Sequence, residues 1–167
     1  MDKLIDKLEE KPLSNKDLMK SLNNQTKILK YDQLSRYNNI SDVLYPYNNF
    51  ILLYQNEKLN SGHWVCVLKN RDCIEFFDPY GLFIDEQMNF LNYKQPLYLS
   101  KLLLDSGYKI IYNNKRFQEF GSDVNTCGRH VLIRLICRHL NLKQYQDLYK
   151  NQKLNPDDIV TMMTSYL

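Results

Sequence analysis

Two β-rich runs separated by a short polar segment constrain the fold of this chain most strongly. The sequence HWVCVL at 63–68 and the sequence CIEFF at 73–77 flank KNRD, a pattern that predicts an antiparallel hairpin. Apolar side chains alternate onto both faces, with Val65, Val67, Ile74 and Phe76 on one and Trp64, Cys66, Leu68, Cys73 and Phe77 on the other. The hairpin is therefore expected at the centre of a sheet that is covered on both sides.

The register of this hairpin brings a histidine beside an aspartate. A turn centred on residues 70–71 sets Leu68 opposite Cys73, Cys66 opposite Glu75 and His63 opposite Asp78. Directly opposed residues hold their Cβ atoms about 4.5–5.5 Å apart on one face, and a slip of one residue would separate them. Such a pair is either a general base with its orienting acid or a structural hydrogen bond at a strand end.

Two cysteines of the hairpin are expected to pack and not to react. In this register Cys66 and Cys73 are diagonal neighbours at roughly 7–8 Å, which is a poor geometry for a disulfide. Both are interpreted as small buried apolar side chains.

The remaining chain alternates helical and extended patterns without a linker. Helices are expected over 1–10, after an N-cap at Ser14, over 97–107 with a stop at Gly107, over 127–140, and over 143–152 and 155–167. Strands are expected over 50–54 and 108–112, with a turn-rich loop over 37–50 and polar loops over 56–62 and 113–126. We interpret 1–167 as a single α+β domain with an N-terminal helical region at about 1–45, a core at about 50–140 and C-terminal helices at about 143–167.

Composition excludes some classes of protein. The 167 residues carry a net charge of +3, which is weak evidence for nucleic-acid binding without a dense basic patch. No apolar run approaches the roughly 20 residues of a membrane span, and the acidic first turns do not resemble a signal peptide. The four cysteines are accordingly expected as free thiols in a reducing compartment.

A third cysteine, Cys127, lies where a helix is expected to begin, within SDVNTCGRH at 122–130. Thr126 is a plausible N-cap, and the free N–H groups of a helix start stabilise a thiolate. Gly128 would leave room for a substrate backbone beside the sulfur. The alternative is a buried, inert thiol.

Polar side chains around Cys127 allow further interpretations. An exposed or ligand-facing side is expected from Arg129, His130, Arg134 and Arg138, whereas Cys137 is expected to pack. A zinc site at Cys127 and His130, with Cys137 or His139, would lack a second compact ligand pair. In the loop upstream, the amide of Gln118 could donate to an oxyanion together with the Cys127 backbone N–H.

The order His63, Asp78, Gln118 and Cys127 resembles a known family. The His-Trp pair at 63–64, the Asp-Pro-Tyr-Gly turn at 78–81 and the Cys-Gly pair at 127–128 resemble the adenovirus endoprotease and the SUMO/ubiquitin-like-protein proteases. Within that clan the chain looks most like the maturation proteases of virophages, Polinton-type elements and large DNA viruses. The resemblance covers about 50–140 and implies an α+β papain-like fold, with a central mixed or antiparallel sheet flanked by helices.

The resemblance also implies roles for individual residues. Cys127 would be the nucleophile, His63 the general base, Asp78 its acidic orienter and Gln118 the oxyanion-hole amide. Because Gln118 lies farther from Cys127 than is usual in the family, either the loop is extended or another amide, such as Asn125, serves. Trp64, which resembles the packing Trp beside the catalytic His, and Gly128 would lie on the substrate side.

The function implied is a cysteine endopeptidase that cleaves capsid or other virion precursors, after small residues such as glycine. No metal or cofactor is expected, although the family suggests activation by DNA or a peptide. We expect a monomer without a membrane partner, in the virion and the infected host cell (cytoplasm or virus factory). The alternatives are a deconjugating protease for ubiquitin-like proteins, and a nucleic-acid-binding virion protein that uses Lys115, Arg116 and the Arg-rich helix 129–138.

Overall fold

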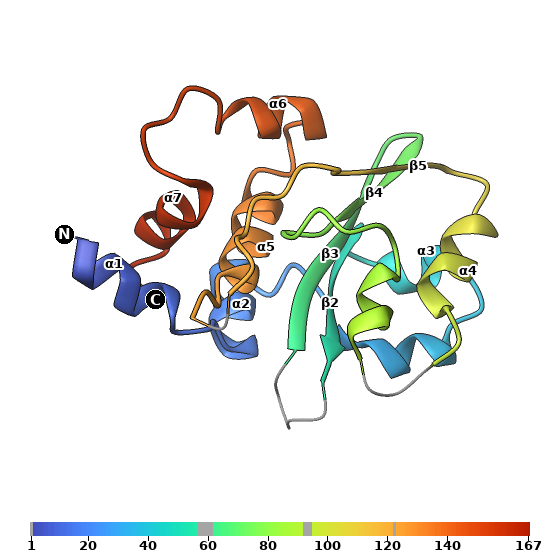
Figure 1. Cartoon of the computed structure of the whole chain (residues 1–167). Helices are drawn as coiled ribbons and strands as arrows, with labels where there is room; N and C mark the ends of the chain where they lie inside the picture. The colour runs from blue at the N-terminus through green and yellow to red at the C-terminus, as the bar shows by residue number, and fades with distance from the viewer. Residues whose placement is uncertain (1, 57–61, 92–94, 122) are drawn as a thin grey trace.

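A mixed five-stranded sheet forms the centre of the computed structural model, which describes residues 2–56, 62–91, 95–121 and 123–167 (Figure 1). The strands follow the order β1 (Ile28–Lys30), β2 (Asn49–Gln55), β3 (Gly62–Asn70), β4 (Cys73–Phe77) and β5 (Lys109–Tyr112). The two edge strands pair in parallel with their neighbours, whereas β2, β3 and β4 pair antiparallel. The predicted α+β class with a central mixed sheet is confirmed.

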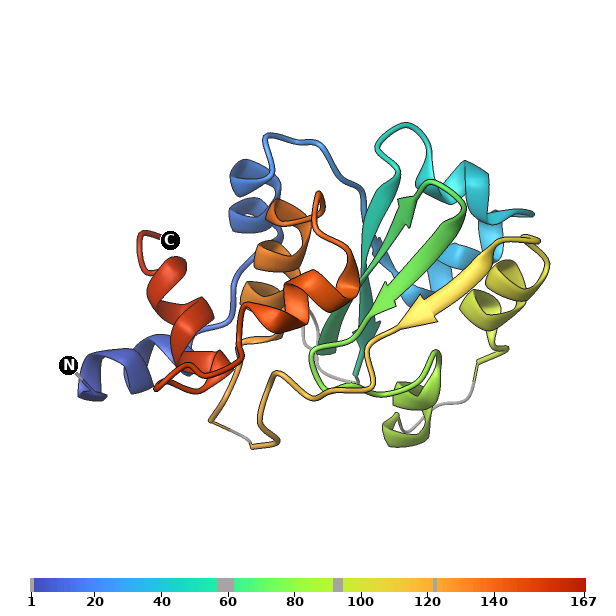
Figure 2. The same ribbon diagram turned by 90° about the horizontal axis from the view of Figure 1, so that it is seen from above.

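Helices cover both faces of the sheet, as the apolar hairpin predicted (Figure 2). One side carries α1 (Asp2–Glu9), α2 (Asn15–Ser21), α5 (Cys127–Ile136), α6 (Leu142–Asp147) and α7 (Pro156–Met163). The other side carries the short 3-10 helices η1 (Tyr31–Arg36) and η2 (Glu86–Phe90) with α3 (Ile40–Leu44) and α4 (Tyr98–Leu104). In the described part of the chain, no helix is long and apolar enough to span a membrane.

The hairpin has the predicted faces but not the predicted register. Val65 and Val67 enter the core under η1, α3 and α4, while Trp64 and Cys66 enter the core under α5. Asn70 pairs with Cys73, so the turn lies at residues 71–72 and the predicted register is wrong by two residues. A shift of two residues leaves every side chain on its face, so alternation could not distinguish the two registers.

The cysteines of the hairpin change neighbours with the register. Cys66 lies opposite Phe77 and Cys73 lies opposite Asn70, so the predicted diagonal contact between the two thiols is wrong. Cys66 is fully buried as expected, whereas Cys73 is only half-buried. All four cysteines are free.

Local signals at helix ends were good predictors. The Ser14 hydroxyl accepts a hydrogen bond from the Asp17 N–H at 3.2 Å and caps α2. The Asn155 side chain likewise accepts from the Asp158 N–H at 2.8 Å and caps α7. Gly107, with φ at +72°, follows α4 as expected.

Short elements were missed. Periodicity did not reveal β1 or η1, and α3 lies inside the segment expected to be a loop, because elements of three to six residues are too short for a pattern. The polar loop expected over 56–62 falls largely outside the described residues.

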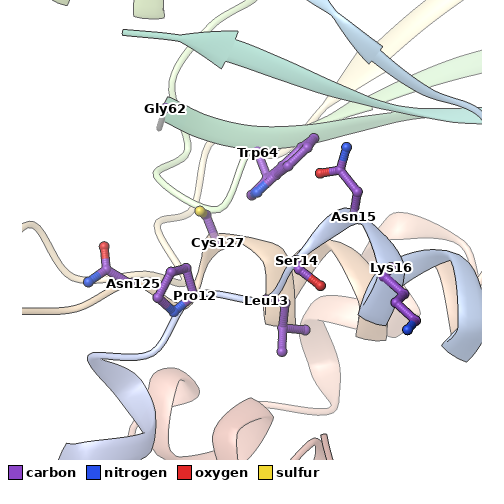
Figure 3. A pocket seen from close by; sticks show the side chains of 9 residues that line it. All are labelled: Pro12, Leu13, Ser14, Asn15, Lys16, Gly62, Trp64, Asn125 and Cys127. Atoms are coloured by element: carbon purple, nitrogen blue, oxygen red, sulfur yellow. The ribbon is translucent and has the colours of Figure 1, made fainter. Parts of the chain in front are cut away.

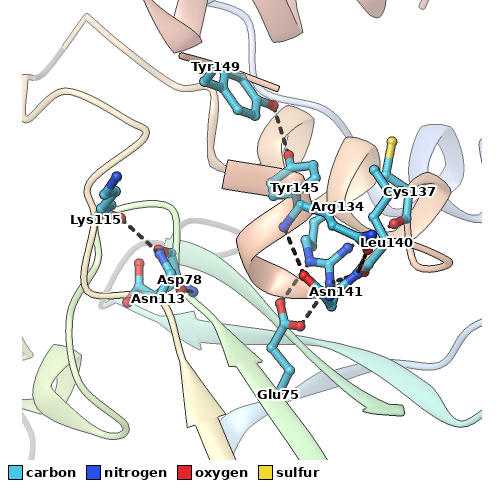
Figure 4. A network of polar contacts seen from close by, with 11 residues as sticks. Glu75, Asp78, Asn113, Lys115, Arg134, Cys137, Leu140, Asn141, Tyr145 and Tyr149 are labelled. Atoms are coloured by element: carbon cyan, nitrogen blue, oxygen red, sulfur yellow. Dashed lines mark hydrogen bonds and ion pairs between the residues drawn. The ribbon is translucent and has the colours of Figure 1, made fainter. Parts of the chain in front are cut away.

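Helix α5 is more deeply buried than its sequence suggested. It packs on β3 with one side and against α2 and α7 with others, so its first turns have little exposed surface. The expectation of an exposed polar side is wrong for Arg129, His130 and Arg134, each at most 1% exposed, whereas Arg138 is exposed. Burial is compensated by polar partners: the Arg134 guanidinium donates to both carboxylate oxygens of Glu75 at 2.7 and 2.8 Å (Figure 4).

Candidate active site

The predicted His–Asp pair forms where β3 begins and β4 ends. His63 Nε2 lies 2.7 Å from Asp78 Oδ1, and both side chains are buried. The pairing of β3 with β4 ends at Cys66 and Phe77, so His63 reaches Asp78 beyond the last paired residues, and Tyr80 of the following turn stacks on the His63 ring at 4.2 Å between centroids. The prediction that these two side chains meet is confirmed, although through a different register.

The Asp78 carboxylate is oriented by its own turn and by a neighbouring loop. The Tyr80 N–H donates to Asp78 Oδ1 at 2.7 Å. The Asn113 amide clamps the Asp78 backbone, accepting from its N–H at 2.9 Å and donating to its C=O at 2.6 Å (Figure 4). Gly81 has φ at +71°, and a Cβ there would lie 2.9 Å from the Lys115 backbone, so the turn requires glycine.

Two of these supporting residues, Tyr80 and Asn113, were not assigned by the sequence reasoning. Tyr80 stands inside the Asp-Pro-Tyr-Gly turn, which is a usable signal for it. Asn113 is one of many polar residues in a loop, and only the tertiary contact with Asp78 distinguishes it.

Cys127, the first residue of α5, completes the group. Its thiol lies close enough to the His63 ring to raise the pKa of that ring. Because Nε2 is bonded to Asp78, Nδ1 is the ring nitrogen that remains for the sulfur. Burial by itself lowers the pKa of His63, but the charge and hydrogen bond of Asp78, with a smaller contribution from Cys127, outweigh burial and raise this pKa to about 9. A ring with this pKa favours transfer of the thiol proton to His63.

Cys127 lines a cavity of about 470 Å³ (Figure 3). Gly62 and Trp64 of β3 line one side of the cavity, and Asn125 and Cys127, at the start of α5, line another. The opposite wall is the N-terminal segment 12–16, which the sequence did not connect with the site. The cavity therefore combines the start of β3, the start of α5 and the N-terminal segment 12–16.

Hydrogen bonds fasten the N-terminal segment to the start of α5. The Asn125 N–H donates to the Glu9 C=O at 2.8 Å, and the Arg129 guanidinium donates to the C=O groups of Leu8 and Lys11 at 3.1 and 3.3 Å. Arg129, expected on an exposed side, instead holds a wall of the cavity in place.

The two candidate oxyanion amides differ in what they bind. Gln118 is 1% exposed, and its Nε2 donates to the Val124 C=O at 3.0 Å, within the loop that leads to Cys127. The Asn125 Nδ2 donates to the Glu10 C=O at 3.0 Å, which turns this amide toward the N-terminal segment. Gln118 retains one free amide N–H for an oxyanion, and its role stays a prediction.

Trp64 and Gly128 occupy different positions at the cavity. Trp64, 8% exposed, lines it directly, whereas Gly128 is not among the described residues that do. A Cβ on Gly128 would lie 3.4 Å from Leu13 Cβ and 3.5 Å from Trp64 Cδ1, which is ordinary contact distance. Substrate binding by either residue stays a prediction.

Two other thiols, those of Cys66 and Cys137, have environments that raise their pKa. Burial, with the neighbouring Glu75 charge, holds the pKa of Cys66 far above its usual value. Burial also raises the pKa of Cys137, which packs against the core beside α5 as expected. Within the described residues, no three His, Cys, Asp or Glu side chains form a group that could hold a metal ion.

A relative in a virophage shows the family. No protein-family model matches the chain. The chain is 38% identical over 168 residues to a Sputnik virophage protein named "Uncharacterized protein V9", with 93% of this chain and 95% of that protein covered. The chain belongs to the family of this virophage protein. This relationship supports a viral protein.

The fold of this V9-family member is similar to that of a viral protease. Two crystal structures of the ASFV pS273R protease, one of them Se-Met, each match with a TM-score of 0.53 over 93% of this chain and 67% of the other. The sequence identities, 14% and 13%, support similarity of fold alone. The expectation of a viral-protease-like fold is thereby confirmed.

Proposed function

We propose that the protein is a cysteine endopeptidase with Cys127 as nucleophile, His63 as general base and Asp78 as orienting acid. One observation carries the proposal: the His63 imidazole is held by the Asp78 carboxylate at 2.7 Å, and its pKa is raised by Asp78 and by the Cys127 thiol at the start of a buried helix. The similarity of the fold to a viral protease supports it.

In the proposed reaction His63 takes the proton from Cys127 Sγ, and the thiolate attacks the scissile carbonyl carbon to form a C–S bond. The developing oxyanion accepts hydrogen bonds from the Cys127 backbone N–H and the Gln118 amide. The His63 imidazolium then protonates the leaving nitrogen as the C–N bond breaks. Water, losing a proton to His63, hydrolyses the acyl-enzyme and releases the thiol.

The surroundings of His63 suit this proton transfer. Asp78 accepts from Nε2 and stabilises the imidazolium, while the stacked Tyr80 ring restricts rotation of the histidine. Both effects keep Nδ1 directed at the sulfur in each step.

The proposed substrates are capsid or other virion precursors, cut after small residues and encountered in the virion or the infected cell. The virophage relative and the fold of a viral protease support a viral substrate, and the resemblance supports the small residue. The nucleic-acid-binding alternative loses much of its basis, because Arg129 and Arg134 are buried and, of the basic residues named for it, Lys115, Arg116 and Arg138 remain exposed.

The test is cleavage of the capsid precursors encoded with this protein by the wild type and by Cys127→Ala and Cys127→Ser. Cleavage should require Cys127, and the new termini should define the cleavage motif. Cys66→Ala, which removes a thiol buried in β3, is the matched control and should retain cleavage. Full activity in Cys127→Ala would refute the proposal, and covalent labelling of Cys127 by a ubiquitin or SUMO vinyl sulfone would favour a deconjugase.

A further inference from the structure

Asp157 is a buried carboxylate of α7 that the proposed reaction does not use. It is 2% exposed and accepts three hydrogen bonds. The Thr126 hydroxyl and His130 Nε2, at 2.8 Å, both contact Oδ1, and the Glu119 N–H donates to Oδ2 at 2.9 Å. One carboxylate from the C-terminal helix therefore joins three points of the chain.

These three points lie around the candidate site. Thr126 immediately precedes Cys127, and His130 lies one turn farther along α5. Glu119 follows Gln118, the candidate oxyanion amide. The carboxylate thus connects the start of the nucleophile helix with the loop that carries Gln118.

The loop needs such an anchor. Residues 119–126 separate Gln118 from Cys127 and form neither helix nor strand over the described positions. On its other side the loop is tied by the Gln118 N–H, which donates to the Pro79 C=O at 2.9 Å in the turn after Asp78. The loop is also held by the Gln118 side chain on the Val124 C=O and by the Asn125 N–H on the Glu9 C=O. The bond from the Glu119 N–H to Asp157 adds an attachment to α7 that further limits the conformational freedom of the loop.

The three contacts depend on the negative charge of Asp157. Burial outweighs the opposing effect of Asp157 and lowers the pKa of His130, so its ring donates as a neutral Nε2–H. Hydrogen bonds to a buried carboxylate are shorter and stronger than those between neutral groups. Replacing the carboxylate by an amide weakens all three at once.

We propose that Asp157 is a positioning residue that holds the Gln118 loop against the start of α5, so that the Gln118 amide and the Cys127 N–H keep the spacing an oxyanion requires. The inference rests on the proposed function and deepens it. It makes α7, which lies outside the region of family resemblance, a part of the site.

A double-mutant cycle between Asp157 and Gln118 tests the connection. Asp157→Asn should lower kcat for a cleaved virion-precursor peptide by about ten- to a hundredfold, with KM changed less than about threefold. In a Gln118→Ala background the same substitution should lower kcat less than about threefold further, because the amide it positions is gone. Asp158→Asn, the same change one residue away on α7, is the matched control and should show neither effect. Multiplicative effects of Asp157→Asn and Gln118→Ala would overturn the inference.

Two measurements separate this inference from the proposed function. Hydrogen exchange over 113–126 should accelerate in Asp157→Asn, at Glu119 above all, and not in Asp158→Asn; unchanged exchange would overturn the anchor whether or not the protein cleaves peptides. Alkylation of Cys127 by iodoacetamide should change less than about threefold, because the His63–Asp78 pair is untouched. Absence of any cleavage by the wild type would instead contradict the proposed function.

A second variant covers the case in which Asp157→Asn does not fold. Thr126→Val keeps the side-chain volume and removes one of the three contacts. It should lower kcat by about three- to tenfold and accelerate exchange at Glu119 less than Asp157→Asn does. A kcat equal to that of the wild type would count against the inference.

Discussion

Two histidine–aspartate pairs of similar geometry lie near Cys127, and the pKa values of their histidines shift in opposite directions. His63 Nε2 is 2.7 Å from Asp78 Oδ1, and His130 Nε2 is 2.8 Å from Asp157 Oδ1, with all four side chains buried. Yet the pKa of His63 is raised to about 9, whereas that of His130 is lowered.

The difference comes from the other groups that each pair contacts. Burial lowers the pKa of both rings, but for His63 the charge and hydrogen bond of Asp78, with a smaller contribution from Cys127, outweigh burial. For His130 burial prevails, and the nearby His63 charge adds to it, while Asp157 shares its charge with Thr126 and Glu119. A short His–Asp contact therefore does not by itself set the pKa of the histidine; the balance between burial and the neighbouring charges does.

The largest expected contrast comes from replacing each histidine by glutamine. His63→Gln removes the proposed base and should lower kcat by about 10³–10⁴-fold. His130→Gln should lower kcat less than about thirtyfold but reduce the free energy of unfolding by about 1–3 kcal/mol, because a buried hydrogen bond is impaired. Steady-state cleavage and urea unfolding measure the two effects. Equal losses of kcat in the two variants would contradict the prediction that His63, and not His130, acts as the base.

The next largest effect is expected from Asp78→Asn. This change keeps the shape of the side chain and removes the charge that raises the pKa of His63, so burial should bring that pKa below its ordinary value of 6.5. We expect kcat to fall by about 10²–10³-fold. The pH profile of Cys127 alkylation should shift together with the pKa of His63. An unchanged profile would show that Asp78 does not set the pKa of His63.

The two pairs should also give opposite dependences of stability on pH. Because folding raises the pKa of His63, its contribution is complete below pH 6.5 and is lost as pH rises to about 9, at no more than about 1.4 kcal/mol per pH unit. Because folding lowers the pKa of His130, its contribution is complete above pH 6.5 and is lost at lower pH. Urea unfolding across pH 5–9 measures both contributions. His63→Gln should remove the loss of stability above pH 6.5, and His130→Gln should remove the loss below pH 6.5.

The smallest expected effect concerns Glu9, a carboxylate whose pKa is affected by the charge of Asp157. Burial, followed by the charges of Asp157 and Asp158, raises the pKa of Glu9 to about 7. Above pH 7 the ionised Glu9 repels these carboxylates, so Glu9→Gln should stabilise the protein there, by less than about 1 kcal/mol because the side chain is still partly exposed to solvent. Below pH 4.5 the effect should vanish, and Glu10→Gln should have none at either pH; a stabilisation independent of pH would exclude this explanation.

Much of the fold followed from local patterns. Alternation in the hairpin determined which residues face each core, and it brought His63 and Asp78 to one side even though the register was wrong by two residues. Capping residues placed the starts of α2 and α7, and the Cys-Gly pair marked the start of α5. These features depend on neighbours within one or two elements, which a sequence contains.

The tertiary structure decided the rest. The N-terminal wall of the cavity, the burial of Arg129 and Arg134, and the attachment of Asp157 to the Gln118 loop all join segments far apart in the chain. A polar side chain carries no sign in the sequence of whether water or a buried partner will satisfy it. That choice is made only when α5 is enclosed between the sheet and the terminal helices, because burial then requires each charge to find a partner.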